Sequence, residues 1–376
     1  ISPAHPLSHA ARAGGKRGID LRMHDDSKLW VPSQETEKLW LPTPGAQLSR
    51  RDALRFSATA GLVAASAAPL AAGASGATER LALTNQGLGS TVKLSNGGGN
   101  FPTMSFGLQV YDDAKARKLT LVALEAGVRN FFSSVLAGNQ KGFAQAIKES
   151  GIPREELYIC GSVVSNRAKG FDGAYAATTK GWQDNMKKFS TGGIEYLDQI
   201  MLDYPANDAV GILGQWRAFE EMHSQGLTKS LSVSNFSPEQ IDLLLEDAET
   251  TVFPCVNQLP FNLAVNGKVP SWGGAAGAVV AANKDRKCLV QAWAPLGGST
   301  GKFNNKIMQA CKEIGDNYDK TASQVALRWI VETGAAFTTS ASKKVHFEED
   351  LNIFDFKLES EQLLTLNTLN GRVGVQ

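Results

Sequence analysis

The sequence has no excess of charge of either sign. Its 376 residues include 38 Lys and Arg against 37 Asp and Glu, which gives a formal net charge of +1 at pH 7. Nucleic-acid-binding domains usually carry a strongly basic face or stripe. We therefore predict no nucleic-acid partner. With 43% hydrophobic residues, the chain is long enough to form the core of one large domain or two ordinary ones.

Cysteine is scarce and is not arranged in motifs. The four cysteines, Cys160, Cys255, Cys288 and Cys311, lie far apart and form no C-x-x-C pair. Zinc sites and dithiol redox sites need closely spaced ligands, so we predict no metal site. Because the neighbouring residues are apolar, we expect buried free thiols. A disulfide in an oxidising compartment is the alternative.

Residues 1–48 form an N-terminal leader rich in Pro, His and charge. It contains K-L-W-V-P at 28–32 and K-L-W-L-P at 38–42. Tryptophan followed closely by proline, without sustained periodicity, predicts extended chain. Its tryptophans would suit a protein partner, since Trp is enriched at binding hot spots. A disordered leader is the alternative.

Residues 49–77 resemble a twin-arginine export signal. Arg50 and Arg51 precede a mildly apolar Ala, Gly and Leu run with small-residue cleavage options such as Ala72-Gly73-Ala74. An Ala-rich soluble helix is the alternative. The position behind a long leader is similar to the second half of a bipartite plastid presequence. We therefore expect the thylakoid lumen of a plastid, with the bacterial periplasm as the alternative.

The same segment offers one route to membrane contact. Residues 56–78 carry no charge and are long enough to cross a bilayer core of about 30 Å. They are poor in Leu and Ile and include Pro69, which weakens a spanning anchor. We expect membrane contact only through 56–78, and only if the signal is not removed.

Residues 78–376 alternate between two patterns. Short apolar runs predict buried parallel strands, at residues 157–160, 199–202, 230–233 and 288–291. Helical patterns lie between them, at residues 115–126, 142–150, 176–189, 211–225, 238–248 and 306–314. Repeated β-α units over this length predict a single α/β domain, a (β/α)₈ TIM barrel with an N-terminal extension. Its functional face would be the carboxyl ends of the strands.

Several stretches, in this order and spacing, resemble the aldo-keto reductase family. The sequence is V-K-L-S-N-G from Val92, G-V-R-N-F-F-S-S-V-L-A-G-N-Q at 127–140, E-S-G-I-P-R-E-E-L-Y-I at 149–159, G-L-T-K-S-L-S-V-S-N-F-S-P-E-Q at 226–240, V-N-Q at 256–258, Q-A-W-A-P-L-G at 291–297, A-S-Q-V-A-L-R-W at 322–329 and D-L-N-I-F-D-F-K-L at 350–358. The resemblance covers nearly all of residues 91–370. It implies a barrel of aldo-keto reductase type that opens with a hairpin.

The resemblance implies four catalytic groups, and this chain differs at all four positions. The family's Tyr acid, its Asp, its Lys and its His fall on Ala137, Phe132, Ser162 and Asp203. Hydride transfer to a carbonyl leaves an alkoxide that a positioned acid must protonate. Ala and Phe cannot donate a proton. We therefore predict no catalytic residue at these positions and a loss of carbonyl reduction.

A relocated acid is the alternative to that loss. The barrel region contains only His223, in an outer helix pattern, and His346, late in the chain. Tyr111, near the exit of the first strand, and Tyr204 are the candidate acids. Tyr204 follows Asp203, and adjacent strand residues point to opposite faces. We expect Asp203 to be a polar residue at a solvated barrel mouth, and not a new base.

The resemblance also implies an NADP(H) site. Ser234, Asn235 and Gln258 match the residues that hold the nicotinamide amide, and Trp293 matches the stacking aromatic. The turn Pro295-Leu296-Gly297 resembles the loop that covers the pyrophosphate. The structural alternative is that the polar residues persist as hydrogen-bonded residues of the barrel rim.

The resemblance is weaker at the adenosine end of that site. The family's Lys and Arg for the 2′-phosphate fall on Ser340 and His346, which have no permanent charge. Lys343 or Lys344 is the nearest replacement. Glu349 and Asp350 match the adenine-contacting pair, with Asp in place of the family's Asn. We therefore expect NADP binding that is weak or absent.

Three functions remain open. The first is an aldo-keto-reductase-like protein with a structural, assembly or binding role, as a subunit of a thylakoid-associated membrane protein complex. The second is an NADP-dependent oxidoreductase with relocated acid catalysis. The third is a non-catalytic sensor of nicotinamide nucleotides. The changed catalytic positions favour the first, because function resides in the site and not in the fold.

Overall fold

The structure is a computed structural model, and it describes residues 89–108, 111–264, 276–297 and 303–370. The leader at 1–48 and the export signal at 49–77 lie outside these residues, so both stay predictions. The described helices include none with the length and apolar character needed to cross a bilayer.

Eight parallel strands close into a barrel in the order β10-β3-β4-β5-β6-β7-β8-β9. The strands are β3 (Met104–Leu108), β4 (Asn130–Ser133), β5 (Tyr158–Val163), β6 (Gln199–Asp203), β7 (Leu231–Ser234), β8 (Val256–Pro260), β9 (Leu289–Trp293) and β10 (Ala336–Thr339). Nearly every strand residue is buried, as expected for parallel strands covered by helices. The predicted TIM barrel is confirmed, and so are the four predicted strands.

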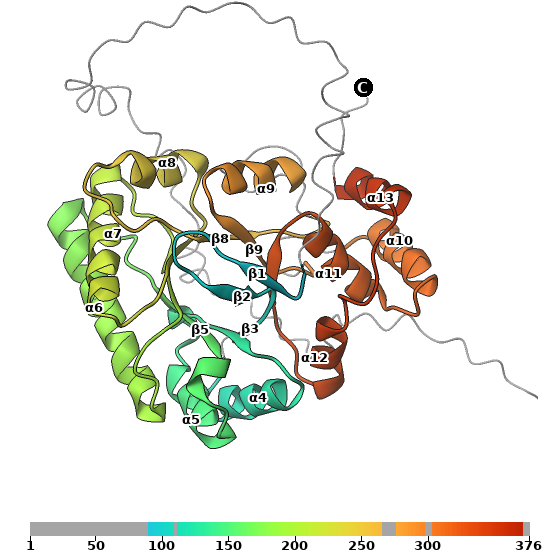
Figure 1. Cartoon of the computed structure of the whole chain (residues 1–376), viewed down its shortest axis with the longest axis horizontal. Coiled ribbons are helices and arrows are strands. Elements are labelled where there is room, and N and C mark those ends of the chain that lie inside the picture. The colour runs from blue at the N-terminus through green and yellow to red at the C-terminus, as the bar shows by residue number, and fades with distance from the viewer. Residues whose placement is uncertain (1–88, 109–110, 265–275, 298–302, 371–376) are drawn as a thin grey trace, which may run out of the picture.

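Helices surround the barrel (Figure 1). They are α4 (Asp113–Glu125), α5 (Gln140–Ser150), α6 (Gly170–Phe189), α7 (Ala209–Ser224), α8 (Pro238–Glu246), α9 (Ala276–Asp285), α10 (Asn305–Asp316), α11 (Ala322–Glu332), α12 (Lys344–Leu351) and α13 (Ser360–Asn370). Three short 3-10 helices are Val135–Ala137, Arg154–Glu156 and Ser190–Gly192. All six predicted helices are present, with ends that differ by a few residues.

The helices begin where the sequence supplies caps. Ser237 with Gln240, and Thr321 with Gln324, form capping boxes at the starts of α8 and α11. At the start of α7, the Asp208 side chain accepts a hydrogen bond from the Gly211 N–H. These local signals fix where each strand-to-helix loop ends, and so they position the loops at the barrel mouth.

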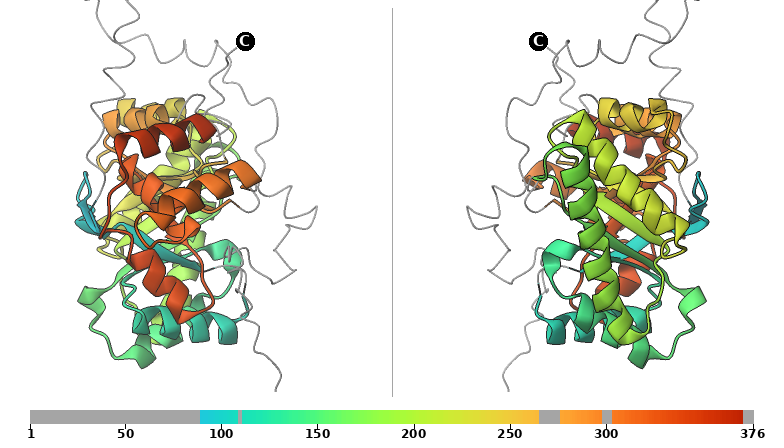
Figure 2. Two further views of the ribbon diagram at one scale, coloured as in Figure 1. Left: turned by 90° about the vertical axis from the view of Figure 1, so that its right-hand side faces the viewer. Right: turned by 90° about the vertical axis from the view of Figure 1, so that its left-hand side faces the viewer.

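An antiparallel hairpin, β1 (Thr91–Lys93) and β2 (Asn100–Pro102), lies across the amino-terminal end of the barrel (Figures 1 and 2). Phe101 of the hairpin packs edge-on against Tyr158 of β5, with ring centroids 5.0 Å apart. Leu94 and Phe101 form one apolar cluster with Val256 and Ala336. The hairpin therefore covers this end, and the carboxyl ends of the strands form the other, where TIM-barrel sites lie.

All four cysteines are buried and unpaired, as predicted. Burial raises the pKa of each thiol, most directly by keeping water from the charged form. They are therefore neutral packing residues, and the disulfide alternative is not observed among them.

Candidate ligand site at the barrel mouth

Inside the barrel, alternate strands contribute layers of four side chains. The strand register, together with the alternation of side chains along each strand, shows which residues share a layer. The layer near the carboxyl ends of the strands consists of Gly107, Ser162, Ser234 and Trp293. The layer beneath it consists of Phe132, Met201, Gln258 and Thr338. Asp203 lies one position further out on β6, paired in register with Ser234. Three of the four positions that the family resemblance assigns to catalytic residues, Phe132, Ser162 and Asp203, thus lie close together.

Phe132 is part of an apolar floor. It forms a buried cluster with Cys160 of β5 and Met201 of β6. The family places a carboxylate at this position, which needs a cation or hydrogen-bond donors in a buried setting. Here the neighbours are a thiol and a thioether, so the phenyl ring matches its surroundings and a carboxylate would not.

Ala137 and Ser162 are joined through the backbone. Ala137 ends the 3-10 helix Val135–Ala137, which follows β4 and is capped by Ser134. The Val135 N–H donates a hydrogen bond of 3.0 Å to the Ser162 Oγ, and Ser162 is fully buried. A neutral hydroxyl therefore holds the turn in place, at the position where the family has its Lys. Neither residue supplies a charge or a strong acid.

Asp203 is buried, which corrects the expectation of a solvated position. It is only 7% exposed. Burial raises the pKa of the Asp203 carboxyl to about 7, against a smaller opposing effect of its hydrogen bond with Ser234. Asp203 thus changes its charge near neutral pH, which is a property of acid–base residues.

Hydrogen bonds link this carboxyl to the predicted nicotinamide residues. The Asn235 side-chain N–H donates to the Ser234 Oγ at 2.9 Å, and the Trp293 Nε1–H donates to the Asn235 Oδ1 at 3.3 Å. Ser234 also bonds Asp203. The four side chains therefore form one connected group across β6, β7 and β9.

The backbone after each of these three strands has a left-handed conformation. The φ angles are 70° at Tyr204, 62° at Asn235 and 50° at Ala294. Such conformations cost free energy outside glycine and occur preferentially at functional sites. Their position directly beyond the linked side chains supports a ligand site at this end of the barrel.

Gln258 is held by another chain of hydrogen bonds. Its amide N–H donates to the Gln291 Oε1 at 2.9 Å, and the Gln291 amide N–H donates to the Ser105 Oγ at 3.0 Å. The structure thus brings together Ser234, Asn235, Gln258 and Trp293 as predicted. Their hydrogen bonds to protein partners match the rim role, and the nicotinamide role stays a prediction.

Sequence reasoning did not single out Thr338, a polar residue of the barrel interior. The Thr338 Oγ1 on β10 is buried and has no hydrogen-bond partner, and Thr338 is 7% exposed. It packs against Gly107, where a Cβ would lie only 2.6 Å from this oxygen, so the position has no room for a larger side chain. The polar run T-T-S at 338–340 was the available signal.

The two candidate tyrosine acids are poorly placed for proton donation. Burial and the nearby Asp203 carboxyl raise the pKa of Tyr204 well above its ordinary value of 10.0, which makes it a weaker acid. Tyr204 lies beyond the end of β6, so strand alternation does not set its direction. The Tyr111 ring lies 4.5 Å from the Lys115 ammonium, and its carbonyl accepts from the Asn139 amide.

The predicted adenosine end has little positive charge. Ser340 follows β10 and His346 lies in α12, both half-buried. The Lys344 Nζ lies 3.0 Å from the Glu125 carboxylate and 3.5 Å from that of Glu348, so Lys344 is neutralised in place. The nicotinamide end of an NADP(H) site fits these residues, but the 2′-phosphate end does not.

The remaining predicted cofactor residues lie on the same side. The turn Pro295-Leu296-Gly297 follows β9, with a Gly297 N–H to Ala294 carbonyl bond of 3.0 Å and a φ of 97° at Gly297. Glu349 and Asp350 lie in α12, half-buried and buried respectively. Lys343, the other replacement considered for the phosphate, is exposed at the start of α12.

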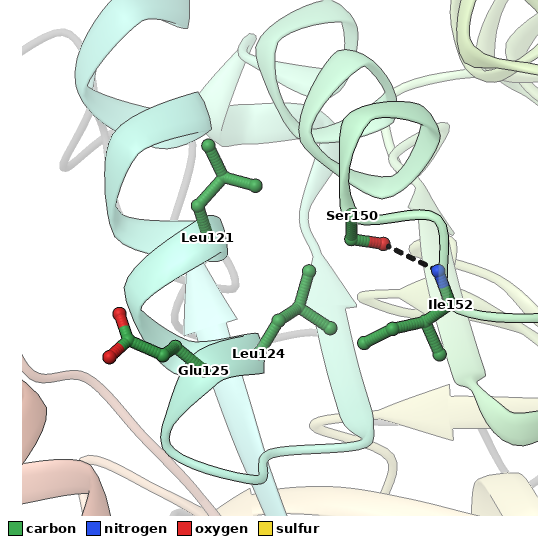
Figure 3. A pocket seen from close by; sticks show the side chains of 5 residues that line it. All are labelled: Leu121, Leu124, Glu125, Ser150 and Ile152. Atoms are coloured by element: carbon green, nitrogen blue, oxygen red, sulfur yellow. Dashed lines mark hydrogen bonds between the residues drawn. The ribbon is translucent and has the colours of Figure 1, made fainter.

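A separate pocket of about 220 Å³ lies outside the barrel (Figure 3). Leu121, Leu124 and Glu125 of α4 line it together with Ser150, the last residue of α5, and Ile152 just beyond it. Both helices end at this pocket, and from there the chain runs to the amino end of the next strand, away from the mouth. No group of potential metal ligands occurs among the described residues. The mouth therefore remains the candidate site.

Comparison with known proteins assigns the family. The model of the aldo/keto reductase family matches residues 93–370. The chain belongs to this family. It is 28% identical over 291 residues to a glyoxal reductase of Bacillus subtilis, covering 76% of this chain and 96% of that protein. It is 25% identical over 272 residues to a 9,11-endoperoxide prostaglandin H2 reductase of Trypanosoma cruzi, covering 72% and 88%.

Solved structures agree with the fold. An aldo-keto reductase from a Medee basin deep-sea metagenome library superposes with a TM-score of 0.64 at 24% identity, covering 74% of this chain and 94% of that one. An aldo/keto reductase from Brucella melitensis gives a TM-score of 0.62 at 24% identity, covering 75% and 100%. At this identity the likeness concerns the fold alone.

Proposed function

We propose that this protein is a member of the aldo/keto reductase family that binds a small molecule or a partner and does not reduce carbonyls. The observation that carries the proposal is the 3.0 Å hydrogen bond from the Val135 N–H to the Ser162 Oγ. It ties Ser162 to the 3-10 helix that ends at Ala137, in a neutral structural contact. Nothing in this contact protonates an alkoxide.

Electrostatics at the mouth support the same conclusion. Carbonyl reduction builds negative charge on oxygen, which a cation or an acid must stabilise. Asp203 is the buried group beside Ser162 and Ser234 that ionises near neutral pH, among the residues that the structure describes. Its anion would repel an alkoxide at alkaline pH. The floor of Phe132 and Met201 adds no compensating charge.

The cellular role proposed is a structural or assembly role in the thylakoid lumen, as a subunit of a membrane protein complex. Its support is the arginine pair Arg50-Arg51 with the uncharged run 56–78, and the tryptophan-containing leader 1–48. Co-purification from detergent-solubilised thylakoid membranes tests this role. Recovery only as a free monomer would contradict it.

The test of the chemical proposal is NADPH oxidation by the purified chain with a panel of aldehydes and ketones. We expect no turnover above the protein-free rate. Tryptophan fluorescence during NADPH titration then separates two cases: a response without turnover supports a nucleotide sensor, and no response supports a purely structural role. Turnover of a few per second would overturn the proposal.

A second candidate function is an NADP-dependent oxidoreductase with relocated acid chemistry, and one observation favours it. The pKa of Asp203 is about 7, so its protonated form is available to donate at neutral pH. The relatives named above are called reductases. In that case, turnover falls as pH rises through about 7, and Asp203→Asn abolishes it.

A further inference from the structure

The pocket between the ends of α4 and α5 is apolar inside and acidic at its edge. Leu121, Leu124 and Ile152 point into it, and the Glu125 carboxylate turns outward at the edge (Figure 3). The Ser150 hydroxyl is already paired, because it donates to a backbone carbonyl of α5 and accepts from the Ile152 N–H. A ligand therefore meets an apolar surface with one carboxylate beside it.

The volume of the pocket limits the size of that ligand. At about 220 Å³ the pocket is smaller than the sites of about 300–1,000 Å³ that hold drug-sized molecules. An apolar cavity of about 150 Å³ is already enough for benzene. The pocket therefore suits a single aromatic side chain. Indole fits its chemistry best, since the ring is apolar and the N–H can donate to a carboxylate at the edge.

The chain that precedes the described residues joins the barrel at the same end as this pocket. The Thr103 hydroxyl, just before β3, donates to the Gly89 carbonyl at 2.6 Å. The Asn130 side chain, at the start of β4, donates to the Pro102 carbonyl at 2.7 Å. Since α4 ends at Glu125, shortly before β4 begins, the pocket and this attachment point both lie toward the amino end of the barrel.

The leader carries the matching side chain twice. Its motifs K-L-W-V-P and K-L-W-L-P place Trp30 and Trp40 two positions after a lysine. The pocket edge has an excess of negative charge, because the carboxylates of Glu125 and Glu348 share the Lys344 ammonium. A lysine near the tryptophan complements this charge. Both the ring and the charge of the motif thus agree with the pocket.

The connecting chain is long enough for the contact. Trp40 and Gly89 are 49 positions apart in the sequence. A chain of that length spans up to about 160 Å when fully extended. A tether of this kind gives an effective concentration of about 1 mM, so a Kd of about 0.1 mM without the tether is sufficient for docking.

We propose that the leader docks on its own barrel, with a tryptophan of residues 28–42 seated in the pocket between α4 and α5. The predicted export signal with Arg50 and Arg51 then lies in a loop that the barrel holds at both ends. Because two helices form the pocket, the contact exists only after the barrel has folded. The folded and unfolded chains therefore present the signal differently. This inference does not depend on the chemistry of the barrel mouth.

Hydrogen exchange of the full chain, followed by mass spectrometry, tests the contact. Replacing Trp30 and Trp40 together by alanine should speed the exchange of amides at 121–126 and 150–153 by up to about tenfold. Replacing Leu7 and Leu21 together by alanine is the matched control, since both lie in the leader outside the motifs, and should leave the exchange unchanged.

A labelled peptide of residues 25–44 measures the affinity without the tether. It is titrated by fluorescence anisotropy against the full chain that carries both Trp→Ala substitutions, and we expect a Kd of about 0.1 mM. Ile152→Glu, inside the pocket, should weaken binding at least about tenfold. Leu364→Glu, at an exposed position on α13, should not. Should Ile152→Glu unfold the barrel, Glu125→Lys at the exposed edge replaces it and should also weaken binding.

Three results overturn the proposal. The first is unchanged exchange at the pocket in the chain without Trp30 and Trp40. The second is peptide binding that is absent at about 1 mM or that persists in the pocket variants. The third is protection that rises with protein concentration, which would assign the pocket to the leader of a second copy. Carbonyl turnover has no bearing on any of these measurements.

Discussion

The hydroxyl of Ser162 accepts a hydrogen bond from the Val135 N–H at 3.0 Å, fully buried from solvent. This contact ties β5 to the turn after β4. Ser162, which the resemblance matches to the family's Lys, therefore fixes the backbone of the turn that carries Ala137.

Ser162→Ala should destabilise the fold without affecting any carbonyl assay. The substitution leaves the Val135 N–H without its partner, at a cost of about 1–3 kcal/mol in the free energy of unfolding. Urea denaturation measures it. The control is Ser224→Ala, whose hydroxyl bonds the Glu221 carbonyl on an exposed face and should matter by less than about 0.5 kcal/mol. Equal effects of the two would contradict a special role for Ser162.

Asp203 should make stability fall as pH rises toward neutrality. Its pKa rises from an ordinary value of 3.8 to about 7 on folding, so between these values the folded state holds a proton that the unfolded state has released. The stabilisation is complete below pH 4 and is lost as pH rises through about 7.

The substitution Asp203→Asn should remove this dependence. We expect the variant to be more stable than the parent by a few kcal/mol at most at about pH 8, and similar to it at about pH 4. Urea titrations at several pH values provide the comparison. A parent whose stability is constant across this interval would show that the carboxyl is not buried in solution.

Restoring one family residue alone should fail. Phe132→Asp places a carboxylate against Cys160 and Met201, which offer no hydrogen-bond donor of adequate strength, and should cost about 3 kcal/mol or more. Phe132→Leu is the control for lost packing and should cost less than about 1.5 kcal/mol.

Adding Ser162→Lys to Phe132→Asp should recover part of that loss. The two positions lie on neighbouring strands, so the introduced charges can pair. A double-mutant cycle measured by urea unfolding should give a coupling energy of about 1–3 kcal/mol. Additive effects would mean that the mouth no longer accommodates the family's ion pair.

Much of the fold could be predicted from the sequence because its signals were local. Runs such as residues 199–202 have the continuous apolar character of strands buried on both faces. Helix caps such as Ser237 and Thr321 mark the starts of helices. Strands with polar interior residues were harder, and β10 and β8, which contain Thr338 and Gln258, carried no apolar run.

The site could be predicted only in part, because burial and pairing are tertiary properties. The identities at Phe132, Ala137, Ser162 and Asp203 are visible in the sequence. The burial of Asp203 is not visible in the sequence. That burial raises the pKa of a residue that we expected to be solvated to about 7. The capture of Lys344 by Glu125 is equally invisible, since it depends on α12 lying beside α4.

Thr338→Val should stabilise the protein in the absence of ligand. The side chain keeps its shape, and a buried hydroxyl without a partner is replaced by a methyl group, which should contribute about 1 kcal/mol to the free energy of unfolding. Thr120→Val is the matched control, because the buried Thr120 hydroxyl donates to the Ala116 carbonyl at 2.8 Å and its removal brings no such gain. Thermal and urea unfolding of both variants make the comparison. If Thr338→Val is instead destabilising, the hydroxyl has a hydrogen-bond partner in solution.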